Sequence, residues 1–195
     1  MKKSGNFRGK KHGSKLWFYV LLSGFILIAF LALQHPKIKQ TAQNLDPTLY
    51  TVKTFYDGDT IGVDMNGKEE KVRFIGIDTP ETHKPNTPPQ CYGQQASDRM
   101  KQLIGTQKVR LENDYTNTNR DRYDRLLRYV YLPDGTFLNQ KQVQEGYAFA
   151  YTGFPFQMKK EFLKFEKEAK DKNLGLWANC QIIQKDGFIH TNDVK

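Results

Sequence analysis

From Tyr50 onward, the alternation of apolar and polar residues predicts short strands separated by turns. The expected strands are rich in β-branched and aromatic residues and cover 50–56, 60–65, 70–75, 109–111 and 126–132. Asp57-Gly58 and Asn66-Gly67 separate the first three strands, and such short turns predict an antiparallel meander. Apolar residues at helical spacing predict helices over 93–104, 137–145 and 156–172.

The order of these elements predicts an α+β fold. Five short strands, with a helix after the third, are typical of a five-stranded barrel of the OB type, here with three helices. We expect this domain to cover residues 49–180. Gly175-Leu176-Trp177 closes it, and residues 181–195 are polar enough to predict a loose tail.

The N-terminal part of the chain has a different pattern. Residues 16–33 form an uncharged apolar run that, as a helix, is about 27 Å long and close to the hydrocarbon thickness of a bilayer. This predicts a transmembrane anchor, because a signal peptide is usually shorter and Phe30 stands where its cleavage site needs a small residue. A cleaved signal peptide remains the alternative, and the lack of a polar face argues against a buried core helix.

Charge orients this segment. Of the 30 cationic residues, six lie in the tail 1–15, which has no acidic residue, so the formal net charge of +9 falls to +3 for the remainder of the chain. The basic tail 1–15 is therefore expected in the cytoplasm, by the positive-inside rule, and the domain outside the cell. Residues 34–48 are expected to be a linker. Because the remainder is only mildly basic, charge is weak evidence for nucleic-acid binding.

Clustered acids near arginines suggest chemistry on a phosphate. Asp59 follows a glycine turn, and Asp78 and Glu81 stand where a strand ends, so the meander can bring them together. Each alone is an ordinary surface acid, but converging carboxylates need a cation, and oxygen ligands favour calcium or magnesium. Arg73, between two apolar residues, and Arg125 are candidates to stabilise the charge on a phosphate.

Several motifs, in order, resemble the staphylococcal nuclease family over about residues 48–180. They are Asp57-Gly58-Asp59-Thr60, the segment 73–81 (RFIGIDTPE), Tyr92-Gly93-Gln94-Gln95-Ala96 and Asp121-Arg122-Tyr123-Asp124-Arg125. Separated motifs in register are far more specific than any one of them alone.

The resemblance implies a calcium-dependent phosphodiesterase that cleaves DNA or RNA and leaves 3′-phosphate ends. It assigns calcium ligation to the side chains of Asp59 and Asp78 and to the backbone carbonyl of Thr79. It makes Glu81 the general base or water-positioning group, and it makes Arg73 and Arg125 the residues that hold the scissile phosphate.

The resemblance also implies substrate contacts. Arg122 and Tyr123 correspond to residues near the terminal phosphate, and Tyr151 resembles an aromatic residue that lies against the base, although the alignment slips by about one residue there. Two departures stand out: Asp124 replaces a common glycine beside Arg125, and the loop 84–90 is less basic than in the best-known member.

Two cysteines, Cys91 and Cys180, complete the candidate features. In an exported domain they are expected to form a disulfide, with two free thiols as the alternative. The expected partners are DNA or RNA and, through residues 16–33, the membrane, and we expect a monomer. The competing functional hypotheses are a non-catalytic nucleic-acid-binding OB module and a phosphodiesterase for small nucleotides, since a fold does not fix a function.

Overall fold

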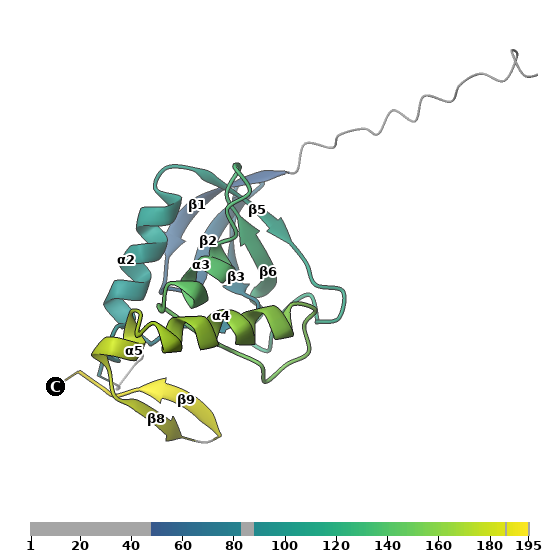
Figure 1. Cartoon of the computed structure of the whole chain (residues 1–195). Coiled ribbons are helices and arrows are strands. Elements are labelled where there is room, and N and C mark those ends of the chain that lie inside the picture. Colours follow the sequence, from purple (N-terminus) through teal and green to yellow (C-terminus); the bar gives the residue numbers. More distant parts are fainter. Residues whose placement is uncertain (1–47, 83–87, 186, 195) are drawn as a thin grey trace, which may run out of the picture. The chain divides into compact units, whose positions relative to one another are not determined.

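The computed structural model describes residues 48–82, 88–185 and 187–194. Five strands form a closed barrel in the order β1-β2-β3-β6-β5 (Figure 1). These strands are β1 (Leu49–Phe55), β2 (Thr60–Met65), β3 (Lys68–Phe74), β5 (Lys108–Glu112) and β6 (Leu126–Tyr131). The predicted five-stranded barrel with helices is confirmed.

The barrel closes through pairs that are distant in the sequence. Strands β1, β2 and β3 form the predicted antiparallel meander, with Ile61 opposite Val72. The β3–β6 pair is parallel, with Arg73 opposite Leu127, and β1 meets β5 with Tyr50 opposite Val109. The end of β3, where the acids cluster, is therefore fixed from both sides.

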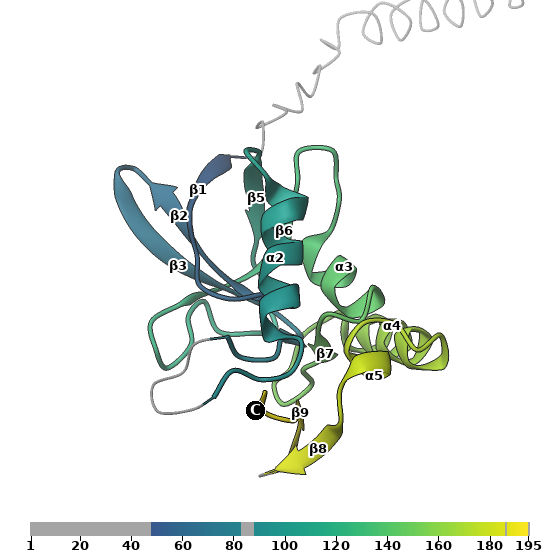
Figure 2. The same cartoon turned by 90° about the vertical axis from the view of Figure 1, so that its left-hand side faces the viewer.

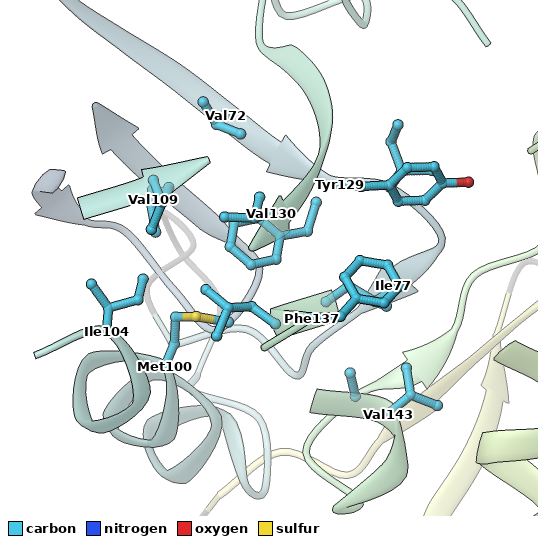
Figure 3. Close-up of a cluster of buried hydrophobic side chains, with 14 of the residues drawn as sticks. Val72, Ile77, Met100, Ile104, Val109, Tyr129, Val130, Phe137 and Val143 are labelled. Atoms are coloured by element: carbon cyan, nitrogen blue, oxygen red, sulfur yellow. The ribbon is translucent and has the colours of Figure 1, made fainter. Parts of the chain in front are cut away.

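The helices cover the side and one end of the barrel (Figures 1 and 2). They are α2 (Gly93–Ile104), α3 (Leu138–Gln144), α4 (Lys159–Asp171) and the short α5 (Leu176–Asn179). Figure 3 shows Met100 and Ile104 of α2 directed toward the barrel residues Val109 and Val130, and all four are fully buried. The first three helices match the predicted ones, although α4 begins three residues later than the pattern indicated.

A buried carboxylate joins the barrel to the start of α4. Asp114 is 3% exposed and accepts hydrogen bonds from the Tyr129 hydroxyl at 2.6 Å and the Gln157 backbone N–H at 2.7 Å. Thr116 donates to the other carboxylate oxygen through both its N–H and its hydroxyl. Burial alone raises the pKa of Asp114, but these hydrogen bonds outweigh it and hold the pKa well below its usual range.

The prediction of a loose C-terminal tail was wrong. Strands β8 (Ile182–Lys185) and β9 (Phe188–Thr191) form an antiparallel hairpin. The Asp186-Gly187 sequence, a strong hairpin signal, stands between two apolar pairs, Ile182-Ile183 and Phe188-Ile189, and carried this information. In both views the hairpin lies at the end of the domain away from the start of β1 (Figures 1 and 2).

The predicted membrane anchor, residues 16–33, lies outside the described residues, as do the basic tail and most of the linker. Among the helices that the structure describes, none combines the length and the apolar character that crossing a bilayer requires.

Candidate active site

Arg73, near the end of β3, lies at the centre of the acidic cluster. Its guanidinium group contacts Asp59 Oδ2 at 3.1 Å and Asp78 Oδ1 at 2.7 Å, and its side chain is only 12% exposed. It also donates to the backbone carbonyl of Ile77 at 2.8 Å. The structure thus brings Asp59 and Asp78 to one cation. Arg73 pairs with both acids, because buried carboxylates need a nearby positive charge.

The turn that carries Asp59 is held closely in place. Oδ2 of Asp59 accepts hydrogen bonds from the Thr79 N–H at 2.7 Å and its hydroxyl at 3.1 Å, which joins the turn to the strand end after β4 (Ile77–Asp78). A Cβ atom at Gly58 would lie 2.8 Å from side-chain atoms of both Ala96 and Thr79, so only glycine fits there. Gln142 Nε2 donates to the Gly58 carbonyl at 2.7 Å.

Negative charge exceeds positive charge around Arg73. Burial lowers the pKa of Arg73, but the charges of Asp59, Asp78, Asp57 and Glu81 outweigh it and raise the pKa above its usual value. Burial, followed by the charge of Asp59, raises the pKa of Asp57 to about 8. Burial also raises the pKa of Asp78 to about 7; Arg73 opposes this rise, and Asp59 and Glu81 add to it.

These residues fit a hard divalent cation. The candidate donors, Asp59, Asp78 and the Thr79 carbonyl, are all oxygen atoms, and the surplus of carboxylates is the charge that such an ion neutralises. Within the part of the chain that the structure describes, no three His, Cys, Asp or Glu side chains gather into a metal site. Two carboxylates and a carbonyl are therefore the protein ligands that we consider, and water would complete the coordination.

Glu81 is positioned through its backbone. Its N–H donates to Gln90 Oε1 at 2.9 Å, and its carbonyl accepts the Gln90 N–H, also at 2.9 Å. A Cβ atom at Gly93 would lie 2.6 Å from the Glu81 carbonyl, so the first residue of α2 packs directly on this segment. The charge of Glu81 acts on both Asp78 and Arg73, which places it in the same cluster.

Arg125 reaches the cluster from the loop between β5 and β6. It forms an ion pair with Asp121 at 2.7 Å, and its charge lowers the pKa of Asp78. Asp124 does not form an ion pair with Arg125. Its side chain is 87% exposed and lies 3.5 Å from Arg120. Its backbone has φ 63°, a conformation that favours glycine. This conformation explains why glycine is common at this position in the family that the sequence resembles.

The residues expected to bind the substrate lie on two loops. The Tyr123 ring is 64% exposed, with the Arg122 and Arg125 guanidinium carbons 4.8 Å and 5.4 Å from its centroid. Tyr151 follows β7 (Phe149–Ala150), and its N–H donates to the Gly76 carbonyl at 2.8 Å. Burial and then the charge of Asp78 raise the pKa of Tyr151, against the effect of Arg73 and Arg122.

A disulfide joins Cys91 and Cys180 across 89 residues. The cysteine before α2 is thereby connected to the segment after α5. The hydroxyl of Thr191 also donates to the Cys91 carbonyl at 2.8 Å, and the Cys91 N–H donates to the Asn192 carbonyl at 2.7 Å. Cys91 follows Gln90, so the C-terminal hairpin is fixed to the segment that holds Glu81.

Comparison with known proteins identifies the family of this chain. Residues 71–179 match the model of the family described as staphylococcal nuclease homologue. The chain belongs to the staphylococcal nuclease family. It is 40% identical over 153 residues to the thermonuclease of Staphylococcus hyicus, an alignment that covers 78% of this chain and 89% of that protein.

Two other relatives of this chain carry similar names. The thermonuclease of Staphylococcus intermedius is 44% identical over 141 residues, which is 71% of this chain and 82% of that protein. Endonuclease YncB of Bacillus subtilis is 41% identical over 140 residues, which is 71% of this chain and 65% of that protein.

Three residues of the candidate active site were absent from the sequence-based assignment. Asp57 lies beside Asp59, whose N–H donates to Asp57 Oδ1 at 2.9 Å. Asp121 pairs with Arg125, and Gln90 holds the backbone of Glu81. The motifs contained Asp57 and Asp121, but only the folded loops show which acid meets which arginine.

Proposed function

We propose that this protein is a calcium-dependent nuclease that hydrolyses phosphodiester bonds of DNA or RNA and leaves 3′-phosphate products. The relatives called thermonuclease and endonuclease support nuclease activity. The convergence of Asp59 and Asp78 on Arg73, with Glu81 and Arg125 acting on the same carboxylate, is the observation that carries the proposal.

The proposed roles follow from charge and position. Asp59, Asp78 and the Thr79 carbonyl would hold calcium, which would supply positive charge to the phosphoryl group when bound. Glu81 accepts a proton from, or orients, the water molecule that attacks phosphorus. The bond to the 5′ oxygen breaks, and this oxygen takes a proton from solvent, which leaves a 5′-hydroxyl and a 3′-phosphate. Arg73 and Arg125 stabilise the negative charge that develops on the phosphoryl group.

The test is a calcium titration of cleavage by the full chain, on labelled single- and double-stranded DNA and RNA. We expect activity to be lost with a chelator and restored by calcium. Glu81→Gln should lower kcat by about 100-fold or more with little effect on KM, because general-base catalysis contributes about 10²–10⁴-fold. Glu161→Gln, at an exposed position on α4, is the matched control. Equal cleavage with and without chelator would contradict the proposed calcium dependence, and stable binding of single strands without any product would favour the non-catalytic binding module.

We also propose that residues 16–33 anchor the protein, with the nuclease domain at the outer face of the membrane. The apolar run, the preceding basic residues and the Cys91–Cys180 disulfide, a bond typical of oxidising compartments, support this arrangement. Protease added to intact cells should digest the domain, and the membrane-bound protein should retain the mass of the full chain. Domain protection in intact cells, with digestion after lysis, would contradict it.

A further inference from the structure

A pocket lies at the end of the barrel where β1 and β6 begin and β2 ends. Its volume is about 440 Å³, which falls within the range of roughly 300–1,000 Å³ that is typical of ligand sites. Leu111 and Leu126 contribute apolar surface to this pocket, and Glu70, Arg120 and Arg128 contribute charged groups. We call it the arginine pocket. None of these residues belongs to the acidic cluster of the candidate active site.

Strand geometry separates the arginine pocket from the active site. In the parallel pair of β3 and β6, Arg73 lies opposite Leu127, so their side chains share a face. Arg128 follows Leu127, and successive residues of a strand point to opposite faces. The arginine pocket and the acidic cluster therefore lie on opposite faces of this pair of strands, and the pocket is a distinct site.

Arg128 is a partly buried cation that contacts neutral oxygen atoms. Its guanidinium group donates to the Leu127 carbonyl at 2.7 Å and to Asn119 Oδ1 at 2.8 Å. Within the part of the chain that the structure describes, no carboxylate forms an ion pair with Arg128. Burial lowers the pKa of Arg128, and the charge of Arg120 lowers it further. Two guanidinium groups are thus held close together, an arrangement that a bound anion would stabilise.

Positive charge exceeds negative charge by one around this pocket. Glu70 pairs with Arg120 at 2.9 Å and with Lys68 at 2.7 Å, and Arg120 also lies 3.5 Å from Asp124. With Arg128, the three cations of this network face two carboxylates, which leaves one positive charge. Each phosphodiester of a nucleic acid carries one negative charge, and guanidinium groups match the geometry of its oxygen atoms. The charge balance therefore fits a phosphodiester.

The loop 119–125 connects the arginine pocket with the active site. Arg120 donates to the Asp124 carbonyl at 2.6 Å, and the Asp121 N–H donates to the Arg125 carbonyl at 3.0 Å. The guanidinium group that lines the pocket and the one that is expected to hold the scissile phosphate therefore belong to one hydrogen-bonded loop. A strand that crosses this loop can contact both groups.

We propose that the arginine pocket binds a phosphodiester of the strand that is being cleaved, away from the scissile bond, through the guanidinium groups of Arg128 and Arg120. The proposal rests on the proposed nuclease function, which identifies the strand, and gives long substrates a second point of attachment. Contacts to phosphate oxygens carry no direct information about the bases, so no sequence preference is expected. The advantage of a long strand over a short one is the property that this pocket controls.

The experiment measures binding of the full chain to a labelled DNA single strand of about 16 nucleotides, because OB-type sites cover about 4–16 nucleotides. Fluorescence anisotropy is recorded with chelator at several salt concentrations. Arg128→Gln removes the charge of the pocket, Arg128→Lys keeps it, and Glu70→Gln removes the opposing charge. Arg110→Gln is the matched control, because Arg110 adjoins Leu111 on β5, points to the opposite face and packs 4.3 Å from the centroid of the Tyr131 ring.

The dependence of affinity on salt counts the phosphate contacts. Each contact to a single strand adds about 0.7 to the slope of log affinity against log salt concentration. We expect Arg128→Gln to reduce this slope by about 0.7 and to weaken binding about three- to tenfold at low salt. Arg128→Lys and Arg110→Gln should keep the wild-type slope, and Glu70→Gln should tighten binding about threefold.

Two results would overturn the proposal. Weaker binding by Arg128→Gln with an unchanged slope would assign this arginine a structural role in holding the loop. An equal reduction of the slope in Arg110→Gln would mean that the strand senses only the general charge of the domain. Glu70→Gln keeps the proposal testable if Arg128→Gln does not fold, because binding that fails to tighten in Glu70→Gln would also overturn it.

Cleavage with calcium separates this proposal from the nuclease proposal. The ratio of kcat/KM on the long strand to kcat/KM on a dinucleotide should fall about threefold or more in Arg128→Gln and stay within twofold in Arg110→Gln. An unchanged ratio would show that the pocket does not hold the strand that is cleaved. If the wild type never cleaves but Arg128→Gln reduces the slope, the nuclease proposal fails and the pocket stands. If the wild type cleaves and both slopes are equal, the pocket fails and the nuclease stands.

Discussion

The disulfide gives the largest stability effect that the structure predicts. Replacing both Cys91 and Cys180 by serine releases a closed segment that spans 89 residues. In the chain-entropy model, a crosslink that closes a loop of this length lowers the conformational entropy of the unfolded chain. The free energy of the unfolded chain rises by about 4–5 kcal/mol at 25 °C, which stabilises the fold. The hydrogen bonds between Cys91 and the hairpin remain in the variant, but they form only in the folded state and do not restrict the unfolded chain.

For a domain of this size, about 1 kcal/mol shifts the thermal midpoint by about 2–4 °C, so the upper limit for the shift is roughly 9–18 °C. The assay is thermal unfolding followed by circular dichroism, with and without dithiothreitol. Reduction should lower the midpoint of the wild type and leave the double-serine variant unchanged. If reduced and oxidised wild type unfold within about 2 °C of each other, then loop closure does not stabilise this fold, and the reasoning is refuted.

Three further predictions concern single residues. Asp114→Asn should lower the free energy of unfolding at pH 7 by about 2–4 kcal/mol, because buried donors lose a charged acceptor. The pKa of Asp114 is lower in the folded than in the unfolded protein, so its contribution to stability is complete above about pH 4 and is lost as the pH falls further. Urea unfolding should therefore show a smaller difference between wild type and variant near pH 3. Gln90→Ala should lower kcat by about 10- to 100-fold with KM unchanged, because Glu81 loses its backbone support; unchanged kcat would exclude this role. Asp124→Gly should leave kcat/KM within twofold; a larger change would indicate that Asp124 affects Arg125.

The sequence was sufficient for the barrel and for the identity of the acidic cluster. Strand alternation and turn dipeptides are local signals, and the spacing of Asp59 and Asp78 around a meander predicts that they meet. The sequence was not sufficient to predict which acid pairs with which arginine. Arg73 satisfies two acids at once, and Arg125 pairs with Asp121 instead of its neighbour Asp124, because backbone conformation decides which side chains face each other.

The hairpin β8–β9 was missed for a different reason. Its sequence has the turn dipeptide of a hairpin, but an isolated hairpin is only marginally stable in water. What stabilises it lies elsewhere in the chain: a disulfide to Cys91, a buried Thr191 and a ring contact with Tyr151. Long-range contacts of this kind have no signature in the segment itself.

The parallel pairing of β3 with β6 has a consequence for the order in which the protein is made. Arg73 leaves the ribosome more than fifty residues before Leu127, its neighbour across the sheet. Until β6 has been synthesised, the strand that carries Arg73 lacks one of its two partners and the barrel stays open. Such long-range closure is slow compared with local folding. In a nascent chain of this nuclease, the strand that carries Arg73 therefore keeps one open edge until translation has passed β6.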